Sequence, residues 1–133
     1  PKLRAYMADQ VDFARDNGYV KTISDRRRYL KDINSRNAVV RGAAERNAVN
    51  APIQGSAADI IKIAMINIHK KLNDSGFKSK MLLQVHDELV FDVYMPELER
   101  IKRLIKEEME SAHTLNVPLD VEIDTGANWL EAH

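Results

Sequence analysis

Residues 81–94 read MLLQVHDELVFDVY, and this stretch decides the predicted fold. Two hydrophobic runs, residues 81–85 and 89–94, stand on either side of the polar break His86-Asp87-Glu88. Short apolar runs on both sides of a brief polar segment are typical of two strands joined by a tight turn. The stretch therefore predicts an antiparallel β-hairpin with three polar side chains at its tip.

Two of these side chains, Asp87 and Glu88, are adjacent carboxylates. A tight turn is formed most favourably by Asn-Gly or Asp-Gly, so turn geometry alone does not account for two neighbouring acids. Carboxylate oxygens are the ligands that Mg²⁺ prefers in proteins. From the residues alone two interpretations stay open, a divalent-metal site and a solvated acidic turn.

The segment before this hairpin is predicted to be largely helical. Residues 2–17 have apolar positions close to the helical period, and Gly18 is suited to the left-handed position that follows a last turn. Residues 19–23 and 27–30 then predict a short basic hairpin.

A helix is expected from about residue 37 to residue 49, and Pro52 is expected to interrupt it. A second helix is predicted from Ser56 to about residue 72, with Ser56 and Asp59 in the spacing of a capping box.

After the central hairpin, Pro96 opens an amphipathic helix that is expected to reach about residue 113, and residues 117–123 alternate as a third strand. No repeat or flexible linker divides the sequence. The predicted fold is α+β: one domain over residues 1–133, with a small antiparallel sheet, formed by the hairpin and a C-terminal strand, packed with several helices.

The zero net charge hides an asymmetry along the chain. Residues 1–62 carry 12 Lys and Arg against 7 Asp and Glu, whereas residues 63–133 carry 8 against 13. Arginine suits phosphate because its planar fork of donors binds two oxygens at once. The basic half is thus either a polyanion-binding face or an ordinary solvated charged face.

Arg46, Asn50 and Gln54 are spaced four residues apart. If the chain is helical throughout this region, they share one face and can donate to the acceptors of the DNA minor groove. The alternative is a junction between two helices, at which Asn50 and Gln54 cap the ends.

The chain contains no cysteine, which excludes disulfides, zinc–thiolate sites and thiol nucleophiles, and which fits a reducing, cytoplasmic location. No apolar run approaches the roughly 18 residues of a membrane span, so no membrane partner is expected.

Several of these segments occur together in bacterial family A DNA polymerases, which the chain resembles over nearly its whole length. The quoted segments are residues 18–20 (GYV), 26–29 (RRRY), 43–46 (AAER), 50–59 (NAPIQGSAAD), 84–91 (QVHDELVF) and 117–119 (VPL), with Asn128-Trp129 near the end. Residues 84–91 match the third polymerase motif of that family, in the palm, and this match is highly specific.

The resemblance implies a template-directed DNA polymerase that uses two Mg²⁺ ions, primer–template DNA and dNTP. Asp87 matches a metal ligand, Glu88 a neighbouring acid of the metal site, and His86 a residue near the primer 3′ end. DNA contacts are implied for Arg46, Asn50 and Gln54, and for the hairpin residues Arg26, Arg27 and Arg28.

Nothing in the sequence resembles the first and second motifs of the family, which carry the other bridging aspartate and the nucleotide-binding helix. We therefore expect a C-terminal palm fragment that is inactive alone. Its sheet edge should be exposed and favour dimerisation or aggregation. At Asp25, where the family usually has Gly, only the details of the turn should differ.

Two alternative functions involve the same residues. A DNA-binding module without catalysis would use the same basic face. A His-Asp phosphohydrolase would need several histidines converging on one metal, whereas His69, His113 and His133 lie in unrelated contexts.

Overall fold

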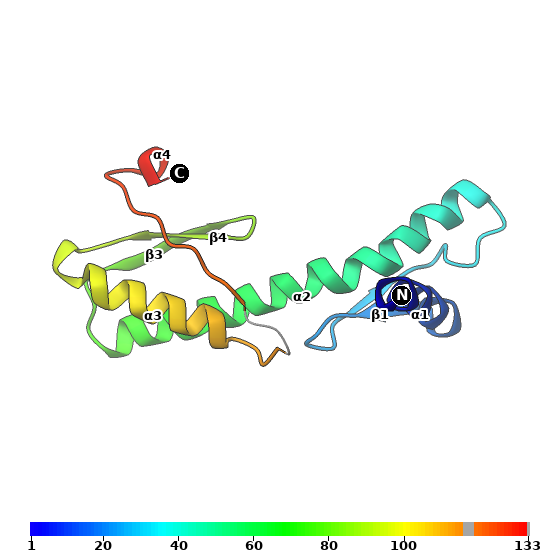
Figure 1. Ribbon diagram of the computed structural model, residues 1–133, viewed down its shortest axis with the longest axis horizontal. Helices are drawn as coiled ribbons and strands as arrows, with labels where there is room; N and C mark the ends of the chain where they lie inside the picture. The colour runs from blue at the N-terminus through cyan, green and yellow to red at the C-terminus, as the bar shows by residue number, and fades with distance from the viewer. Residues whose placement is uncertain (116–118, 133) are drawn as a thin grey trace. The chain divides into compact units, whose positions relative to one another are not determined.

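The structure is a computed structural model that describes residues 1–115 and 119–132. Its contacts divide the chain into two compact units, Pro1–Asp59 and Ile60–His133. Figure 1 shows the elements of both units, and each unit is described by itself below.

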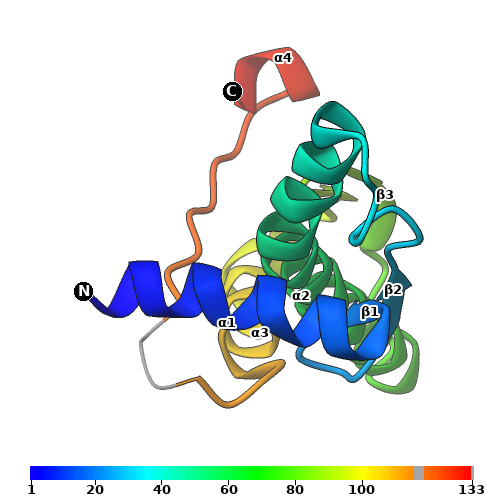
Figure 2. The same cartoon turned by 90° about the vertical axis from the view of Figure 1, so that its right-hand side faces the viewer.

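The first unit opens with helix α1 (Lys2–Asn17), which ends as predicted at Gly18 in the left-handed conformation, with φ 81°. Strands β1 (Tyr19–Lys21) and β2 (Arg27–Tyr29) then pair antiparallel, with Val20 opposite Arg28. Figure 2 shows α1 beside this basic hairpin. The core of the unit is formed by Ala14, Val20, Leu30, Ile33, Ala44 and Ala48.

The turn of the basic hairpin contains Asp25 at φ 61°. Glycine adopts this left-handed region most easily, and Asp is one of the few other residues that tolerate it. Asp25 thus occupies a conformation that Asp tolerates, and the expectation that only the details of the turn differ from those of the family stays a prediction.

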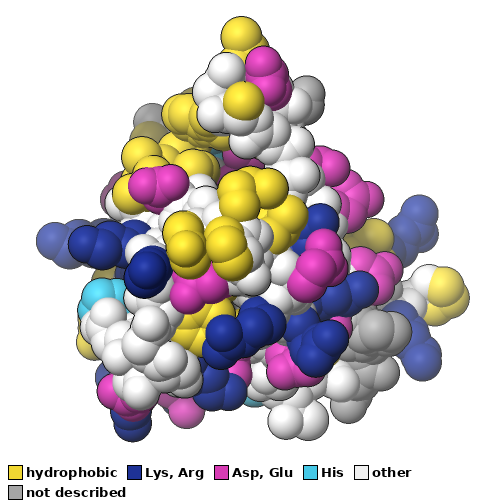
Figure 3. All heavy atoms as spheres, turned by 90° about the vertical axis from the view of Figure 1, so that its left-hand side faces the viewer, with side chains coloured by type: hydrophobic (Ala, Val, Ile, Leu, Met, Phe, Trp, Pro, Cys, Tyr) yellow, Lys and Arg dark blue, Asp and Glu magenta, His cyan; other side chains and the backbone are white. Residues whose placement is uncertain are grey.

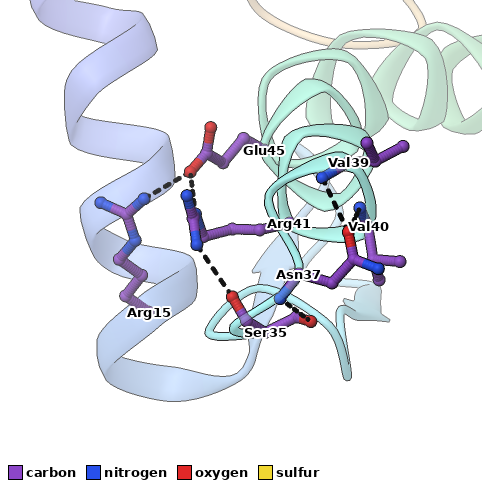
Figure 4. A network of polar contacts seen from close by, with 7 residues as sticks. All are labelled: Arg15, Ser35, Asn37, Val39, Val40, Arg41 and Glu45. Atoms are coloured by element: carbon purple, nitrogen blue, oxygen red, sulfur yellow. Dashed lines mark hydrogen bonds and ion pairs between the residues drawn. The ribbon is translucent and has the colours of Figure 1, made fainter.

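Helix α2 (Ala38–Asp74) begins at a polar network shown in Figure 4. The side-chain oxygen of Asn37 accepts hydrogen bonds from the backbone N–H groups of Val39 (3.0 Å) and Val40 (3.4 Å), which caps the helix. Glu45 accepts from Arg15 of α1 at 2.5 Å and lies 3.7 Å from Arg41. These contacts fix the start of α2 against α1.

The expected break at Pro52 is wrong, because α2 is one helix of 37 residues with Pro52 in its interior. Proline lacks the N–H that would bond to the carbonyl of Ala48, a local cost of about 3 kcal/mol. Packing against the rest of the unit offsets this cost, since Ala48 is fully buried and Pro52 is buried. Ser56 and Asp59 consequently lie inside a helix, and the predicted capping box does not form.

The second unit contains the central hairpin, formed by β3 (Lys80–Val85) and β4 (Glu88–Asp92). The strands pair antiparallel as predicted, with Val85 opposite Glu88 and Leu83 opposite Val90. The register shifts between Met81 and Leu83, which leaves Leu82 as an extra residue in a bulge.

The short 3₁₀ helix η1 (Met95–Glu97) leads into helix α3 (Leu98–Ser111), which confirms the helix predicted to open at Pro96. Helix α3 and the end of α2 bury Ala64, Ile68, Leu72, Ile101 and Ile105, and Leu89 and Phe91 of β4 pack on this core. The face in Figure 3 has hydrophobic side chains gathered at its centre among charged ones.

The predicted third strand is wrong over residues 119–123, which the structure describes as irregular chain, while Val117 and Pro118 lie outside the described residues. An alternating pattern becomes a strand only when it finds a neighbour to pair with, and each described sheet has two strands. The short helix α4 (Trp129–Ala132) was not predicted. The α+β class with small antiparallel sheets is confirmed, and the assignment of residues 1–133 to one palm domain stays a prediction.

Candidate functional site

The tip of the β3–β4 hairpin is a two-residue turn made by His86 and Asp87. His86 has φ 55°, in the left-handed region. The side-chain amide of Gln84 donates to the carbonyl oxygen of His86 at 2.9 Å and braces the turn. His86, Asp87 and Glu88 are all exposed, so the structure brings the three predicted residues together in contact with solvent.

The oxygen donors of this tip fit a hard divalent cation. Mg²⁺ keeps several waters and is usually bound through one or two carboxylates together with substrate phosphates. Asp87 makes no hydrogen bond or ion pair with the described parts of the chain. Within those same parts, no group of three or more His, Asp or Glu is close enough to hold a metal. The assignment of a metal to Asp87 and Glu88 stays a prediction.

The base of the same hairpin is held by Glu97, a buried carboxylate that the sequence analysis missed. Glu97 accepts hydrogen bonds from the backbone N–H groups of Lys78 and Ser79 and from the Ser79 hydroxyl, at 2.8–3.1 Å. The Ser79 hydroxyl in turn accepts from the N–H of Tyr94 at 2.8 Å. The network joins the residues before β3 to those after β4 and so fixes where the hairpin begins.

Burial raises the pKa of Glu97, but the hydrogen bonds from Lys78 and Ser79 and the charge of Arg100 outweigh it. The pKa of Glu97 therefore lies below its ordinary value.

In the first unit, the continuity of α2 decides between the two interpretations of Arg46, Asn50 and Gln54. All three lie inside the helix and all three are exposed. Their spacing of four residues places them on one face, and none of them is at a helix end. The structure thus forms the polar ladder and not the helix junction.

The arginine hairpin, here defined as residues 22–29, carries Arg26, Arg27 and Arg28, which are all exposed. Together with Gln54, Gly55 and Ala51 of α2, these arginines line a cavity of about 430 Å³. No acidic residue is among the described residues that line it. The cavity therefore brings one member of the polar ladder together with the three predicted arginines.

Asp59 connects the arginine hairpin to α2. Its carboxylate accepts a hydrogen bond from the Thr22 hydroxyl and another from Nε of Arg26 at 2.5 Å, and only 4% of the residue is exposed. Burial raises the pKa of Asp59, but these two hydrogen bonds and the charge of Arg26 bring that pKa below its ordinary value. One turn earlier in α2, the Ser56 hydroxyl accepts from the N–H of Ile23 at 2.8 Å. The sequence analysis missed Asp59 as a site residue.

The family model described as DNA polymerase family A matches residues 1–131. The chain belongs to this family. The resemblance stated from the sequence motifs is therefore confirmed.

The relatives agree with this membership. DNA polymerase I of Lactococcus lactis subsp. lactis is 58% identical over 132 residues, which are 99% of this chain and 15% of that protein. DNA polymerase I of Caldicellulosiruptor bescii is 53% identical over 131 residues, which are 98% of this chain and 15% of that protein. The chain thus spans about 15% of the length of these curated relatives.

A solved structure of the same family is also similar to this chain. It is the polymerase domain of Pol1 from M. smegmatis in complex with DNA primer-template and dNTP. The match has a TM-score of 0.94 and 52% sequence identity, and it covers 97% of this chain and 23% of that one.

In the present chain, the described residues include no helix whose length and apolar character would allow it to span a membrane.

Proposed function

We propose that this chain supplies a metal-ligating hairpin and a DNA-contacting helix face to a template-directed DNA polymerase. The reaction joins a dNTP to a primer 3′-hydroxyl and releases pyrophosphate. Because the chain corresponds to about 15% of its relatives, the complete activity is proposed for an enzyme of their length. Roles in DNA replication and repair, and a cytoplasmic location, belong to the same proposal.

The observation that carries the proposal is the unbroken course of α2 past Pro52. It sets the guanidinium of Arg46 and the amides of Asn50 and Gln54 along one exposed face. Such donors suit the N3 and O2 acceptors that every base pair presents in the minor groove. A polymerase needs this kind of contact because it must hold any sequence.

The arginines supply the sequence-independent part of the affinity. Arg26, Arg27 and Arg28 are exposed beside the cavity that Gln54 also lines. Phosphate contacts by such residues release counterions, so that binding weakens steeply as salt rises.

Asp87 is proposed as the principal metal ligand, with Glu88 as a supporting acid and His86 near the primer end. When bound, Mg²⁺ would lower the pKa of the primer hydroxyl and stabilise the charge on the reacting phosphates. The hairpin contributes position, since the Gln84 brace and the Glu97 network hold both ends of its strands. Among the described residues no third ligand joins Asp87 and Glu88 in a metal-binding group, so we expect the 133-residue chain alone not to extend primers.

The DNA-contacting assignment is tested by fluorescence anisotropy with a labelled primer–template at several salt concentrations. The Arg46→Ala/Gln54→Ala variant should bind several-fold more weakly than the wild-type chain, because it loses both ends of the ladder. Arg103→Ala removes an exposed charge from α3 and serves as the control. Equal affinity of the double variant and the wild type would overturn the assignment.

The metal assignment separates a polymerase segment from a DNA-binding module without catalysis. Mn²⁺, a paramagnetic substitute for Mg²⁺, should broaden the NMR signals of residues 84–89, and Asp87→Asn should remove most of this broadening. Broadening that is unchanged in Asp87→Asn would favour the non-catalytic module.

A further inference from the structure

The arginine hairpin closes on α2 at a point where only glycine fits. A Cβ atom placed on Gly55 would lie 2.5 Å from Cγ2 of Thr22, a separation that folded proteins do not show. The next nearest atoms, Cβ of Thr22 and Nη2 of Arg26, would be at the ordinary contact distances of 3.7 and 3.9 Å. One methyl group therefore sets how closely the hairpin approaches the helix.

The same approach is held from the other side by Asp59, one helical turn after Gly55. Its buried carboxylate binds the Thr22 hydroxyl and Nε of Arg26, while Nη2 of Arg26 donates to the carbonyl oxygen of Gly55 at 3.3 Å. A carboxylate that is 4% exposed needs such partners, because an unpaired buried charge is strongly unfavourable. Asp59 thus holds Arg26 in one place and leaves the hairpin little freedom to lift from α2.

We propose that Gly55 and Asp59 are positioning residues that clamp the arginine hairpin onto α2, so that Arg27 and Arg28 can contact the DNA backbone while Gln54 contacts the minor groove. This inference rests on the proposed function for the identity of the bound polyanion. The clamp itself is a feature of the protein without DNA. Gly55 permits the close approach, and Asp59 maintains it.

For the Asp59→Asn variant, the clamp predicts a change in DNA affinity that is opposite in sign to the change expected from charge alone. Asp59→Asn removes a negative charge from beside a polyanion site, and by charge alone it should strengthen DNA binding. If the carboxylate instead holds the arginines in place, Asp59→Asn should weaken DNA binding by about three- to tenfold. The slope of log affinity against log salt concentration should also become shallower, by an amount that corresponds to the loss of about one phosphate contact. Asp25→Asn removes a charge from the exposed hairpin turn and is the matched control.

The close contact between Gly55 and Thr22 is tested by asking whether a second substitution rescues the first. Gly55→Ala should push Thr22 away, and adding Thr22→Ser should restore the closed position. Serine keeps the hydroxyl that donates to Asp59 and lacks the methyl group that the new Cβ would meet. Gly42→Ala, in the same helix, is the control, because a Cβ there meets only the end of the Arg46 side chain, at 3.7 Å.

Two measurements on the 133-residue chain test whether Gly55 and Asp59 hold the arginine hairpin on α2. The first is amide hydrogen exchange by NMR, followed at Thr22 and Ile23, whose N–H groups bond to Arg26 and Ser56. Gly55→Ala should raise their exchange rates at least about tenfold, whereas the Gly55→Ala/Thr22→Ser chain should return to within about threefold of wild type. The second is primer–template anisotropy, in which the same variants should lose and regain affinity in parallel.

The outcomes separate the clamp from the proposed function. Unchanged hairpin exchange in both Gly55→Ala and Asp59→Asn overturns the clamp, whatever the DNA result. Tighter DNA binding by Asp59→Asn overturns the positioning role. A wild-type chain with normal hairpin protection that binds no DNA refutes the proposed function and with it the role of the clamp in DNA contact.

Discussion

The core of the second unit offers a quantitative test of the structure at Ile68. This residue is fully buried between α2 and α3 and is packed with Ile101 and Ile105. Ile68→Ala deletes three carbon atoms, which at about 0.8 kcal/mol for each buried CH₂ removes about 2.4 kcal/mol of transfer free energy. The cavity left behind adds to this loss, so we expect the free energy of unfolding to fall by about 3–4 kcal/mol.

The matched control is Ile66→Ala on the same helix, since Ile66 is 67% exposed. It removes the same atoms from a solvated position and should change the free energy of unfolding by no more than about 0.5 kcal/mol. Both variants are compared with the wild type by urea unfolding, followed by circular dichroism. Because Leu89 and Phe91 rest on this core, Ile68→Ala should also increase hydrogen exchange in β4.

A loss below about 1 kcal/mol for Ile68→Ala, or equal losses for the two variants, would refute the packing of α2 against α3. The slope of the unfolding free energy against urea must be the same in all three chains for the comparison to hold.

Two further predictions concern acid stability and self-association. The pKa of Glu97 lies below its ordinary value of 4.5, so its contribution to stability is present above that pH and is lost as pH falls toward the lower folded-state pKa. The melting temperature of Glu97→Gln should therefore lie below that of the wild type at neutral pH, and the gap should narrow below about pH 4.5; a gap independent of pH would contradict the network. We also expect the wild-type chain to self-associate through β3, where Leu82 and Leu83 are 58% and 43% exposed, and Leu82→Lys to reduce this association. Sedimentation velocity at rising concentration measures it, and a strictly monomeric wild type would count against the prediction.

Elements specified by local pattern were predictable from the sequence. The helix α1 with its Gly18 cap, both hairpins and α3 each follow from periodicity and turn residues within one short window. The path of α2 was not predictable in this way. The cost of Pro52 is local and visible in the sequence, whereas the packing of Ala48 that offsets it comes from residues far along the chain.

The same limit explains the two carboxylates that the sequence analysis missed. Asp59 bonds to residues 33 and 37 positions earlier, and Glu97 to residues 18 and 19 positions earlier. A single sequence carries no direct sign of such pairs. The sequence around Asp59 gave one weak indication of a contact. Asp59 follows Gly55 by one turn within a run of small residues, and another element can approach a helix closely at such a run.

The residues of the turn between β3 and β4 are not the ones that would form this turn at the lowest free energy. His86 adopts φ 55°, a conformation that costs a non-glycine residue about 1–2 kcal/mol and that glycine would adopt more cheaply. Asp87 and Glu88 add the repulsion of two neighbouring carboxylates at the same tip. Turn formation requires neither cost, because a turn with glycine at position 86 and no second acid would connect β3 to β4 with less strain. Under the proposed function both costs have a reason: a divalent cation relieves the repulsion between the acids, and the turn fixes the direction of His86 and Asp87 before any substrate arrives.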